Sequence, residues 1–587
     1  MISLDMGGTS TDVSLFDEDY DYSYQLQVGE AQLQTQAFYI ETVASGGGSI
    51  CAYDGYHLTV GPESAGAQPG PAAYGVGGPL TLTDVHLLLG RIDQKQFGIP
   101  IFPNEAQQRL EDLQKALLEK TGKSRSAEDL LQGFVEISQE IMAGAIQKVT
   151  LARGIDPKAF CLLAFGGAGG LHACGIAELL QITDILIPED AGLLSAYGIS
   201  QALEQKISEK QLLMTLAELE GELDNTLTAL EASALQELAR EGFKPEEVDI
   251  HQRILFMRFL GQNHSLEIIY QSPEQDLKKE FQQAYREVYG HYLEDTPIEV
   301  ESIRVIAREK TKATSQIYAE NDSQYSPSYR HKQSCYFSGK WQEIPVYPKS
   351  SLQAGAYITE PALIVDPYST SYLAPGWELW MDQNRTLIIS RKEPTSPTVQ
   401  AGNVIQEIEL ELFKRRFMRI AENMGVQLQR TSQSVNIKER LDFSCALLNA
   451  QGELVANAPH IPVHLGSLGI CVREVMKALP IQQGDTLICN HPAFGGSHLP
   501  DITLISPVFY QEVCVAFVAN RAHHAEIGGK RPGSMPPDAQ NLQEEGVIIP
   551  PTYLAKGGEV LWDDIQQLLR ESPYPSRSPA ENLADIQ

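Results

Sequence analysis

Hydrophobic and polar positions at the start of the chain predict strands and helices in alternation. Residues 2–4 and 13–16 are apolar runs on either side of a polar, glycine-rich turn, which predicts a hairpin. A helix over residues 126–154 opens with a capping box and keeps its apolar positions at helical spacing. The run 160–165 then predicts a strand, and residues 172–180 predict a helix behind a second glycine-rich loop.

The middle of the chain predicts first helices and then strands. Residues 203–242 are acidic and carry Leu and Ala at helical spacing, which predicts an amphipathic helix pair with a solvated acidic face. Residues 248–391, which follow, contain no cluster of residue types typical of a catalytic site. Their apolar runs predict strands at residues 251–261, 264–271, 303–307, 344–347 and 362–365.

A domain boundary is predicted at residues 392–402, which contain two prolines and no hydrophobic period. Beyond it, a helical pattern of apolar residues ends at Gly425. The next predicted elements are a strand that carries Asp442 and a loop with His460 and His464, two further candidates for lining a metal pocket. At 587 residues the chain is too long for one core, so we expect two to four domains.

Composition and charge narrow the class of partner. The formal net charge of −31 argues against nucleic acid and against an anionic membrane, because both need a positive protein face. The sequence has no run of 18 apolar residues and no export signal at its start, so we expect no membrane partner and a cytoplasmic location. The eight cysteines are scattered without a C-x-x-C pair, which favours buried free thiols over a zinc ribbon or a redox motif.

The densest candidate chemistry lies in residues 489–546. Two apolar runs, 502–509 and 513–518, predict a hairpin that returns the chain, so residues before its first strand can meet residues after its second. Two imidazoles and a carboxylate with an open position are typical of a catalytic divalent metal site. Single His and Asp residues also cap loops, but glycine pairs flank this cluster and let backbone approach a ligand. The candidates are His491, His498, Asp501, His523, His524 and Glu526.

The turn at residues 5–12 has the composition of a phosphate-binding loop. Backbone N–H groups around Gly7 and Gly8 can approach phosphate oxygens without obstruction by side chains. The carboxylates of Asp5 and Asp12 can hold a hydrated Mg²⁺ or position a water. The same D-x-G-G-T sequence is equally compatible with a tight hairpin turn that binds nothing.

A second glycine-rich loop, residues 166–170, stands between a predicted strand and a predicted helix. This order of elements offers backbone amides and a helix N-terminus to a nucleotide. The loop lacks the G-K-[ST] of a Walker A motif, and its spacing differs from G-x-G-x-x-G. Ten further glycines within residues 45–78 predict short loops that line a site or pack closely on one another.

Together, these motifs resemble those of the hydantoinase/oxoprolinase family, which includes ATP-dependent 5-oxoprolinases, N-methylhydantoinases and acetone and acetophenone carboxylases. Residues 1 to about 390 resemble the C-terminal part of the A-type component through DMGGTSTDVS, SGGGS, VGPESAGAQPGPAAYG, TDVHLLLGR, LARGID and FGGAGGLHA. Residues from about 403 onward resemble the N-terminal part of the B-type component through RTSQSVNIKERLDFSCALL, PVHLGS, GGSHLPD, RAHHAEIGG and PGSMPP. Both components on one chain are similar to the fused 5-oxoprolinase branch.

The resemblance implies an α/β and α+β multidomain protein. Its parts would be an actin-like ATPase part at 1–200, a β-rich domain at 201–391, a linker at 392–402 and a mixed α/β metal-site domain at 403–587. The loop at the N-terminus would be the second of two phosphate loops, and the loop at 166–170 the adenosine-side motif. The nucleotide-binding residues implied are Gly7, Gly8, Thr9, Ser10, Thr11, Gly166, Gly167, Ala168 and Gly169.

The resemblance also reduces the number of candidate metal ligands. The family pattern H-x-x-D with a later His maps onto His498, Asp501 and His523. It favours His523 over His524 as the ligand, which leaves His524 or Glu526 to move a proton. The implied cofactors are ATP, Mg²⁺ and a divalent transition metal, which two His and one Asp leave open among Zn, Mn and Fe.

The activity implied is ATP-dependent hydrolysis of a small cyclic amide, with 5-oxo-L-proline opened to L-glutamate, by a homo-oligomer. Phosphorylation of the lactam oxygen would create the electrophile that a metal-activated water attacks. The alternatives are an N-methylhydantoinase, an ATP-dependent carboxylase and a truncated, non-catalytic remnant. The family carries a first phosphate loop before DMGGT and extends well beyond the LQEEG segment, so we expect an internal fragment of a fused enzyme or a truncated gene.

Overall fold

The chain forms a mixed α/β multidomain protein with several sheets, as the sequence predicts. The computed structural model describes all residues except 18, 21, 29–30, 152–154, 220, 261, 263–264, 290–295, 311–323, 392–405, 439 and 459–460. The chain divides into two compact units. Unit 1 comprises Met1–Ser195, Ala319–Gln429 and Ser434–Gln587, and unit 2 comprises Ala196–Tyr318 and Arg430–Gln433.

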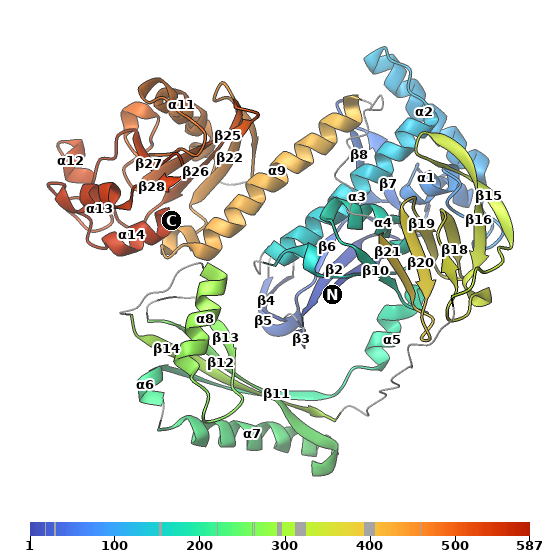
Figure 1. Ribbon diagram of the computed structural model, residues 1–587, viewed down its shortest axis with the longest axis horizontal. Coiled ribbons are helices and arrows are strands. Elements are labelled where there is room, and N and C mark those ends of the chain that lie inside the picture. The colour runs from blue at the N-terminus through green and yellow to red at the C-terminus, as the bar shows by residue number, and fades with distance from the viewer. Residues whose placement is uncertain are drawn as a thin grey trace. The chain divides into compact units, whose positions relative to one another are not determined.

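A sheet of nine described strands forms the centre of the N-terminal part of unit 1 (Figure 1). Its order is β17-β20-β21-β10-β9-β1-β2-β3, and β6 pairs with β2. Strands β1, β9 and β10 are parallel neighbours, whereas β1 and β2 form the predicted hairpin. The strands are β1 (Ile2–Met6), β2 (Thr11–Asp17), β3 (Asp19–Tyr20), β6 (Glu41–Val43), β9 (Leu162–Phe165), β10 (Asp184–Ile187), β17 (Tyr357–Ile358), β20 (Trp377–Met381) and β21 (Leu387–Arg391).

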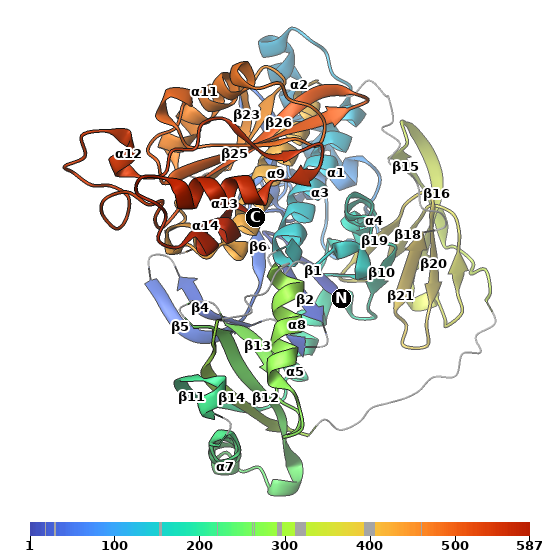
Figure 2. The same cartoon turned by 60° about the vertical axis from the view of Figure 1, so that its left-hand side comes forward.

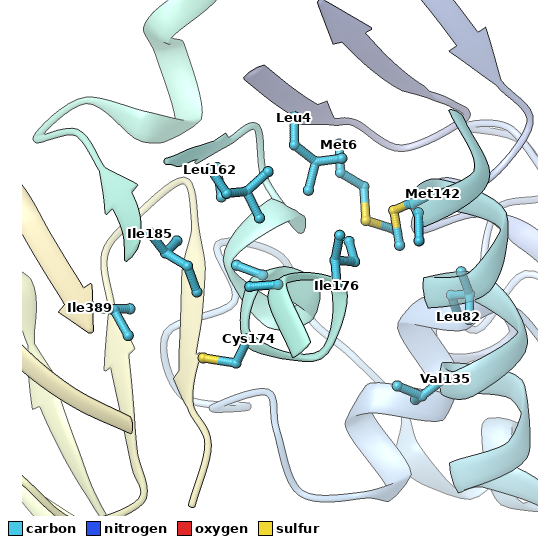
Figure 3. Close-up of a cluster of buried hydrophobic side chains, with 14 of the residues drawn as sticks. Leu4, Met6, Leu82, Val135, Met142, Leu162, Cys174, Ile176, Ile185 and Ile389 are labelled. Atoms are coloured by element: carbon cyan, nitrogen blue, oxygen red, sulfur yellow. The ribbon is translucent and has the colours of Figure 1, made fainter. Parts of the chain in front are cut away.

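Helices α3 (Ala127–Leu151) and α4 (Gly169–Leu180) contribute to one apolar core with this sheet. Figure 3 shows Leu4 and Met6 of β1 together with Met142 of α3 and Ile176 of α4. Because side chains alternate along a strand, burial of Leu4 and Met6 places Asp5 between them on the opposite face. The core therefore fixes the strand end that carries the candidate phosphate loop.

Smaller elements complete this part of unit 1. A separate sheet has the order β15-β16-β18-β19, and two hairpins are formed by β4 with β5 and by β7 with β8. The elements are β4 (Tyr22–Val28), β5 (Ala31–Phe38), β7 (Ser49–Tyr53), β8 (Leu58–Ser64), α1 (Leu82–Leu88), α2 (Pro103–Thr121), β15 (His331–Phe337), β16 (Lys340–Pro348), β18 (Ala362–Val365) and β19 (Thr370–Leu373). Helix α5 (Leu194–Ser200) begins in unit 1 and continues into unit 2.

Unit 2 is an α+β unit around a sheet of order β11-β14-β12-β13. The helix pair predicted at 203–242 is wrong in its first half, because residues 205–215 form a strand that pairs with β14. Pairing with this long neighbour outweighs the local helical spacing. The elements are β11 (Gln205–Thr215), α6 (Leu216–Leu219), α7 (Leu223–Arg240), β12 (Val248–Phe259), β13 (Leu266–Ile269), α8 (Leu277–Tyr289) and β14 (Ile298–Glu309).

The C-terminal part of unit 1 contains a sheet of seven described strands, in the order β23-β22-β26-β25-β24-β27-β28. Figure 2 labels β23, β25 and β26 of this sheet together with helices α11, α13 and α14. Helix α11 packs on one face of this sheet, and α13 and α14 pack on the other. The strands are β22 (Phe443–Asn449), β23 (Leu454–Asn457), β24 (Thr486–Cys489), β25 (Asp501–Tyr510), β26 (Val513–His523), β27 (Thr552–Lys556) and β28 (Glu559–Val560). The helices are α9 (Gln406–Thr431), α10 (Val435–Lys438), α11 (Pro462–Ala478), α12 (Leu542–Glu545), α13 (Trp562–Glu571) and α14 (Pro579–Ile586).

The predicted hairpin at 502–518 is confirmed as β25 and β26, which pair from Asp501–His523 to Tyr510–Val513. Its turn residues Gln511 and Glu512 have φ values of 46° and 67°, in the left-handed region that a tight two-residue turn requires. No helix among the described residues is both long enough and apolar enough to cross a membrane.

Two other predictions differ from the structure. The helix predicted to end at Gly425 continues to Thr431, because residues beyond the glycine pack against β22. His464 lies in the first turn of α11 rather than in a loop, and His460 and the predicted linker 392–402 fall outside the described residues. The β-rich domain over 201–391 stays a prediction, and three strands from its C-terminal end, β17, β20 and β21, pair within the nine-stranded sheet.

Candidate functional sites

Three side chains converge at the open end of the β25–β26 hairpin. Asp501 begins β25 and His523 ends β26, and the two residues are direct partners in the register. Asp501 Oδ1 lies 3.3 Å from His498 Nε2 and 3.3 Å from His523 Nδ1, and these two ring nitrogens are 3.0 Å apart. One ligand atom from each residue lies within 4.8 Å of the others. The structure therefore brings together three of the six candidate ligands.

Two more groups extend this cluster. His464 Nε2 lies 3.2 Å from Asp501 Oδ2, and Asp442 Oδ2 lies 3.5 Å from His523 Nδ1. His464 comes from α11, and Asp442 directly precedes β22, the neighbour of β26 in the sheet. The sequence predicts His464 as a residue that lines the metal pocket, and the structure places it beside Asp501. Asp442 is predicted to lie on a strand but is given no part in the site. The one signal in the sequence that could have pointed to Asp442 as part of the site is its position at the end of a predicted strand.

The donor set and its burial fit a divalent metal ion. Asp501 is fully buried, and neither of its carboxylate oxygens has an aligned hydrogen-bond donor among the described residues. A buried ionised carboxylate without such donors is unfavourable unless it is paired or coordinates a metal. Imidazole nitrogens and a carboxylate oxygen suit Zn, Mn or Fe. His498, Asp501 and His523 would be the ligands.

The electrostatics of the cluster favour the protonation states that bind metal. Burial raises the pKa of Asp501, but the nearby His464 and His523 outweigh burial and hold that pKa well below its usual range. Burial lowers the pKa of His498, and His523 lowers it further against the attraction of Asp501. An ionised carboxylate and a neutral imidazole are the forms that coordinate a metal.

A fully buried guanidinium holds the loop that precedes His498. Arg521 donates from Nε to Thr503 Oγ1 at 2.8 Å, from one terminal nitrogen to Ser497 Oγ at 3.2 Å and from the other to the Gly495 carbonyl at 2.8 Å. Its position on β26, opposite Thr503, ties this loop to both strands of the hairpin. The sequence pattern does not reveal this role, because Arg is most often exposed.

The remaining candidate residues of this region lie in other networks. His524 is buried, with Nδ1 2.8 Å from Asn582 Oδ1, and burial lowers its pKa. Glu526 Oε1 accepts hydrogen bonds from the Ser576 hydroxyl and from the Ser578 N–H. Both residues therefore hold the C-terminal segment, and the proton-transfer role predicted for them stays a prediction. His491 accepts from a backbone N–H within its own loop.

The first glycine loop presents backbone donors to solvent. The N–H groups of Gly47 and Gly48 donate to the carbonyls of Gly7 and Gly8 at 3.0 and 2.6 Å, which supports the turn from behind. Gly8 and Thr9 are exposed, and their N–H groups have no acceptor among the described residues. These two amides are free to bind an anion such as phosphate.

Two carboxylates flank this loop, and the second glycine loop approaches one of them. Asp5 and Asp12 face each other in the register of β1 and β2, with Asp5 Oδ2 accepting from Ser195 Oγ at 2.6 Å and Asp12 Oδ1 from Thr42 Oγ1 at 2.7 Å. Gly166 has a φ of 77°, and a Cβ there would lie 2.5 Å from Asp5 Oδ1. The close approach of the two loops therefore requires glycine at this position.

Other predicted nucleotide-binding residues differ in exposure and structure. Thr11 is fully buried and donates its hydroxyl to the Ser45 carbonyl, so it supports the loop from inside. Ser10 is partly exposed. Gly169 is the first residue of α4, which begins three residues before the predicted helix. The loop itself is Gly166, Gly167 and Ala168.

These two sites define a class of protein in which an amide-lined loop with carboxylates is combined with a buried His/Asp cluster of metal-binding type. Family models match nearly all of the chain: Hydantoinase/oxoprolinase at residues 1–206, the Hydantoinase/oxoprolinase C-terminal domain at 214–392, and Hydantoinase B/oxoprolinase at 406–587. The chain belongs to the hydantoinase/oxoprolinase family, which confirms the resemblance of its motifs.

Individual relatives agree with this assignment. The chain is 36% identical to the 5-oxoprolinase PfmaA of Pestalotiopsis fici and 35% identical to the 5-oxoprolinase of Saccharomyces cerevisiae, over its whole length and over 47% and 48% of theirs. It thus spans about half the length of these curated relatives. The crystal structure of an ATP-dependent caprolactamase from Pseudomonas jessenii is similar, with a TM-score of 0.59 and 26% identity over 67% of this chain and 59% of that one.

Proposed function

We propose that this protein takes part in the ATP-dependent hydrolysis of a cyclic amide, with 5-oxo-L-proline as substrate and L-glutamate as product. The names of the full-length 5-oxoprolinase relatives and of the caprolactamase support this reaction class. The structural observation that carries the proposal is the buried Asp501 carboxylate, without an aligned donor among the described residues and in contact with His498 and His523.

The first step would activate the lactam. An unstrained lactam opens slowly because its amide is resonance-stabilised and its nitrogen is a poor leaving group. Transfer of the γ-phosphoryl group of ATP to the lactam oxygen, with release of ADP, gives an imidate-like electrophilic carbon. The free amides of Gly8 and Thr9 would bind the transferring phosphoryl group, and Asp5 and Asp12 would hold Mg²⁺ beside it.

The second step would use the His/Asp cluster. A divalent Zn, Mn or Fe ion held by His498, Asp501 and His523 would supply Lewis acidity that lowers the pKa of water toward about 7. Asp442 lies 3.5 Å from His523, and its side chain is about one third exposed, so this carboxylate would accept the proton of the attacking water. Addition of this water and cleavage of the C–N bond, with protonation of the nitrogen, would leave an acyl phosphate. A second water would then hydrolyse the acyl phosphate to the carboxylate and inorganic phosphate, which completes the conversion to an open amino acid.

The proposal also covers the partners of the protein, its cellular location and its oligomeric state. A net charge of −31 supports a small-molecule substrate and no nucleic-acid partner. We propose a cytoplasmic location and a homo-oligomeric state, both of which can be tested on the purified protein and in fractionated cells.

The experiment is a comparison of the wild-type chain with His498→Ala and His523→Ala, using His491→Ala as the matched control outside the cluster. We expect both cluster variants to lose bound transition metal and glutamate formation from 5-oxoproline while keeping their affinity for ATP. Lactam opening that persists at the wild-type rate in these variants contradicts the metal role. ATP turnover that requires bicarbonate identifies a carboxylase instead, and absence of ATP–Mg²⁺ binding identifies a non-catalytic remnant.

A further inference from the structure

A pair of buried imidazoles joins α1 to α4. His86 Nε2 lies 2.9 Å from His172 Nε2, and the ring planes are nearly perpendicular, at 85°. His86 is only 2% exposed, and His172 is fully buried. A hydrogen bond between two neutral imidazoles requires opposite tautomers, one with its proton on Nε2 and the other with its proton on Nδ1. The pair therefore forms one hydrogen bond, with one donor and one acceptor ring, between α1 and α4.

Two other roles do not fit the surroundings of this pair. Among the described residues, no third His, Cys, Asp or Glu lies close enough to complete a metal site with these rings. The buried Arg91 guanidinium nearby also disfavours a cation. Burial and then Arg91 lower the pKa of His172 to about 3, so this ring stays neutral near pH 7 and is no proton switch there.

From His86, contacts lead along α1 to the first glycine loop. Thr83, one helical turn before His86, donates both its N–H and its hydroxyl to the Gly47 carbonyl at 2.8 Å. The N–H of Gly47 in turn donates to the Gly7 carbonyl at 3.0 Å. A Cβ on Gly47 would lie 2.8 Å from Thr83 Oγ1, so the two segments already touch. A shift of α1 is therefore transmitted to the loop.

From His172, contacts lead along α4 to the second glycine loop and back to the first. Ala168, just before α4, donates its N–H to the carbonyl of Met6 at 3.2 Å. Met6 directly precedes Gly7 in the chain, so the second glycine loop is hydrogen-bonded to the start of the first. The two loops are thus fixed to each other on one side by β1 and on the other by the imidazole pair.

We propose that His86 and His172 are positioning residues that set the spacing of the two glycine loops and thereby the affinity of the site for a nucleotide. This inference rests on the nucleotide role proposed above for the loops. It adds a determinant of binding that lies in the core between two helices, at two histidines to which the proposed reaction gives no part.

Amide hydrogen exchange in the nucleotide-free, full chain tests this proposal. His172→Leu removes the link, His172→Gln keeps a polar atom at a similar reach, and Ile176→Val alters only packing on the same helix. We expect the amides of Gly47 and Ala168 to exchange about fivefold faster in His172→Leu, as loss of one hydrogen bond predicts for local opening. The glutamine variant should recover part of this protection, and Ile176→Val should leave both amides unchanged.

Equal acceleration in His172→Leu and Ile176→Val, or a change confined to α4, would overturn the proposal, because the pair would then contribute packing alone. Calorimetry with ATP and Mg²⁺ on the same proteins separates this inference from the proposed function. We expect His172→Leu to weaken ATP binding about fivefold, and unchanged affinity despite faster exchange would overturn the link to binding. If the wild-type chain binds no ATP while Gly47 and Ala168 still respond, the proposed function fails and the coupling of the loops stands.

Discussion

Asp501 and His523 face each other as paired residues of two neighbouring strands, with Asp501 Oδ1 3.3 Å from His523 Nδ1. The spacing of these groups is therefore set by backbone hydrogen bonding rather than by flexible loops. A slip of one residue in the register would turn one of the two side chains to the other face of the sheet. The geometry of the predicted metal site therefore depends on the register of β25 with β26.

Replacing Asp501 with Asn should remove metal binding and leave the fold intact. The amide has the shape of the carboxylate but lacks its charge, so we expect metal affinity to fall by more than about 100-fold, beyond the loss typical of outer-shell changes. Metal content after dialysis and the metal-induced rise in Tm measure this effect. An asparagine variant that retains metal at the wild-type level would show that the ion is held elsewhere.

Replacing Arg521 with Lys should lower both stability and metal affinity. One ammonium group cannot reach Thr503, Ser497 and the Gly495 carbonyl together, so we expect a loss of about 2–4 kcal/mol in the free energy of unfolding. Displacement of the loop before His498 should weaken metal binding by roughly tenfold. Denaturant unfolding and metal titration provide the two measurements.

The exposed Arg473 offers a matched control, since it donates to a single backbone carbonyl. Arg473→Lys should change neither the free energy of unfolding nor the metal affinity appreciably. If Arg521→Lys behaves in the same way, the buried guanidinium does not position the loop.

Replacing Gly166 with Ala should separate the two glycine loops. The new Cβ would lie 2.4 Å from the Met6 carbonyl oxygen, at a positive φ, so we expect a loss of about 2 kcal/mol or more of stability together with weaker ATP binding. Gly8 has no atom within 4 Å of a Cβ position, so Gly8→Ala should leave the free energy of unfolding nearly unchanged. Thermal unfolding of both variants checks the contrast, and equal destabilisation would contradict it.

The carboxylate of Glu526 should make stability depend on pH. Burial raises the pKa of Glu526, but hydrogen bonds from Ser576 and Ser578 lower it by more, so the net direction is downward. A depressed native pKa means that the stabilisation is present above the unfolded value of about 4.3 and is lost as pH falls through the native value. We expect Glu526→Gln to cost roughly 1–3 kcal/mol at pH 7. Denaturant unfolding at several pH values should show this difference shrinking in acid, and a constant difference would contradict the assignment.

The sequence predicts the ligand-bearing hairpin well because its determinants are local. Two apolar runs separated by a short polar turn predict β25 and β26, and the turn brings the chain back so that His523 lies beside Asp501. His464 and Asp442 join the cluster only through α11 and through the pairing of β22 with β26. Contacts of this kind depend on the order of strands in the sheet, which periodicity does not encode.

Most differences between the predicted and the observed elements arise where tertiary packing outweighs the local preference of the sequence. Residues 205–215 have helical spacing but form a strand because β14 provides a long pairing edge. Gly425 ends the apolar pattern but not α9, because Met424 and Leu428 pack against β22. The partners of Glu526 lie about fifty residues further along the chain, so its predicted catalytic role could not be tested from the sequence around it.

The turn of the β25–β26 hairpin lies at the opposite end of the hairpin from the proposed metal ligands. Strand β25 has ten residues from Asp501 to Tyr510, so these two residues are nine steps apart, a span of about 30 Å at the usual rise of a strand. Tyr510 and Val513 beside the turn are exposed. A fluorescent label or an inserted tag at Gln511 would therefore report on this part of the molecule, while the strand pairing that spaces the ligands stays intact.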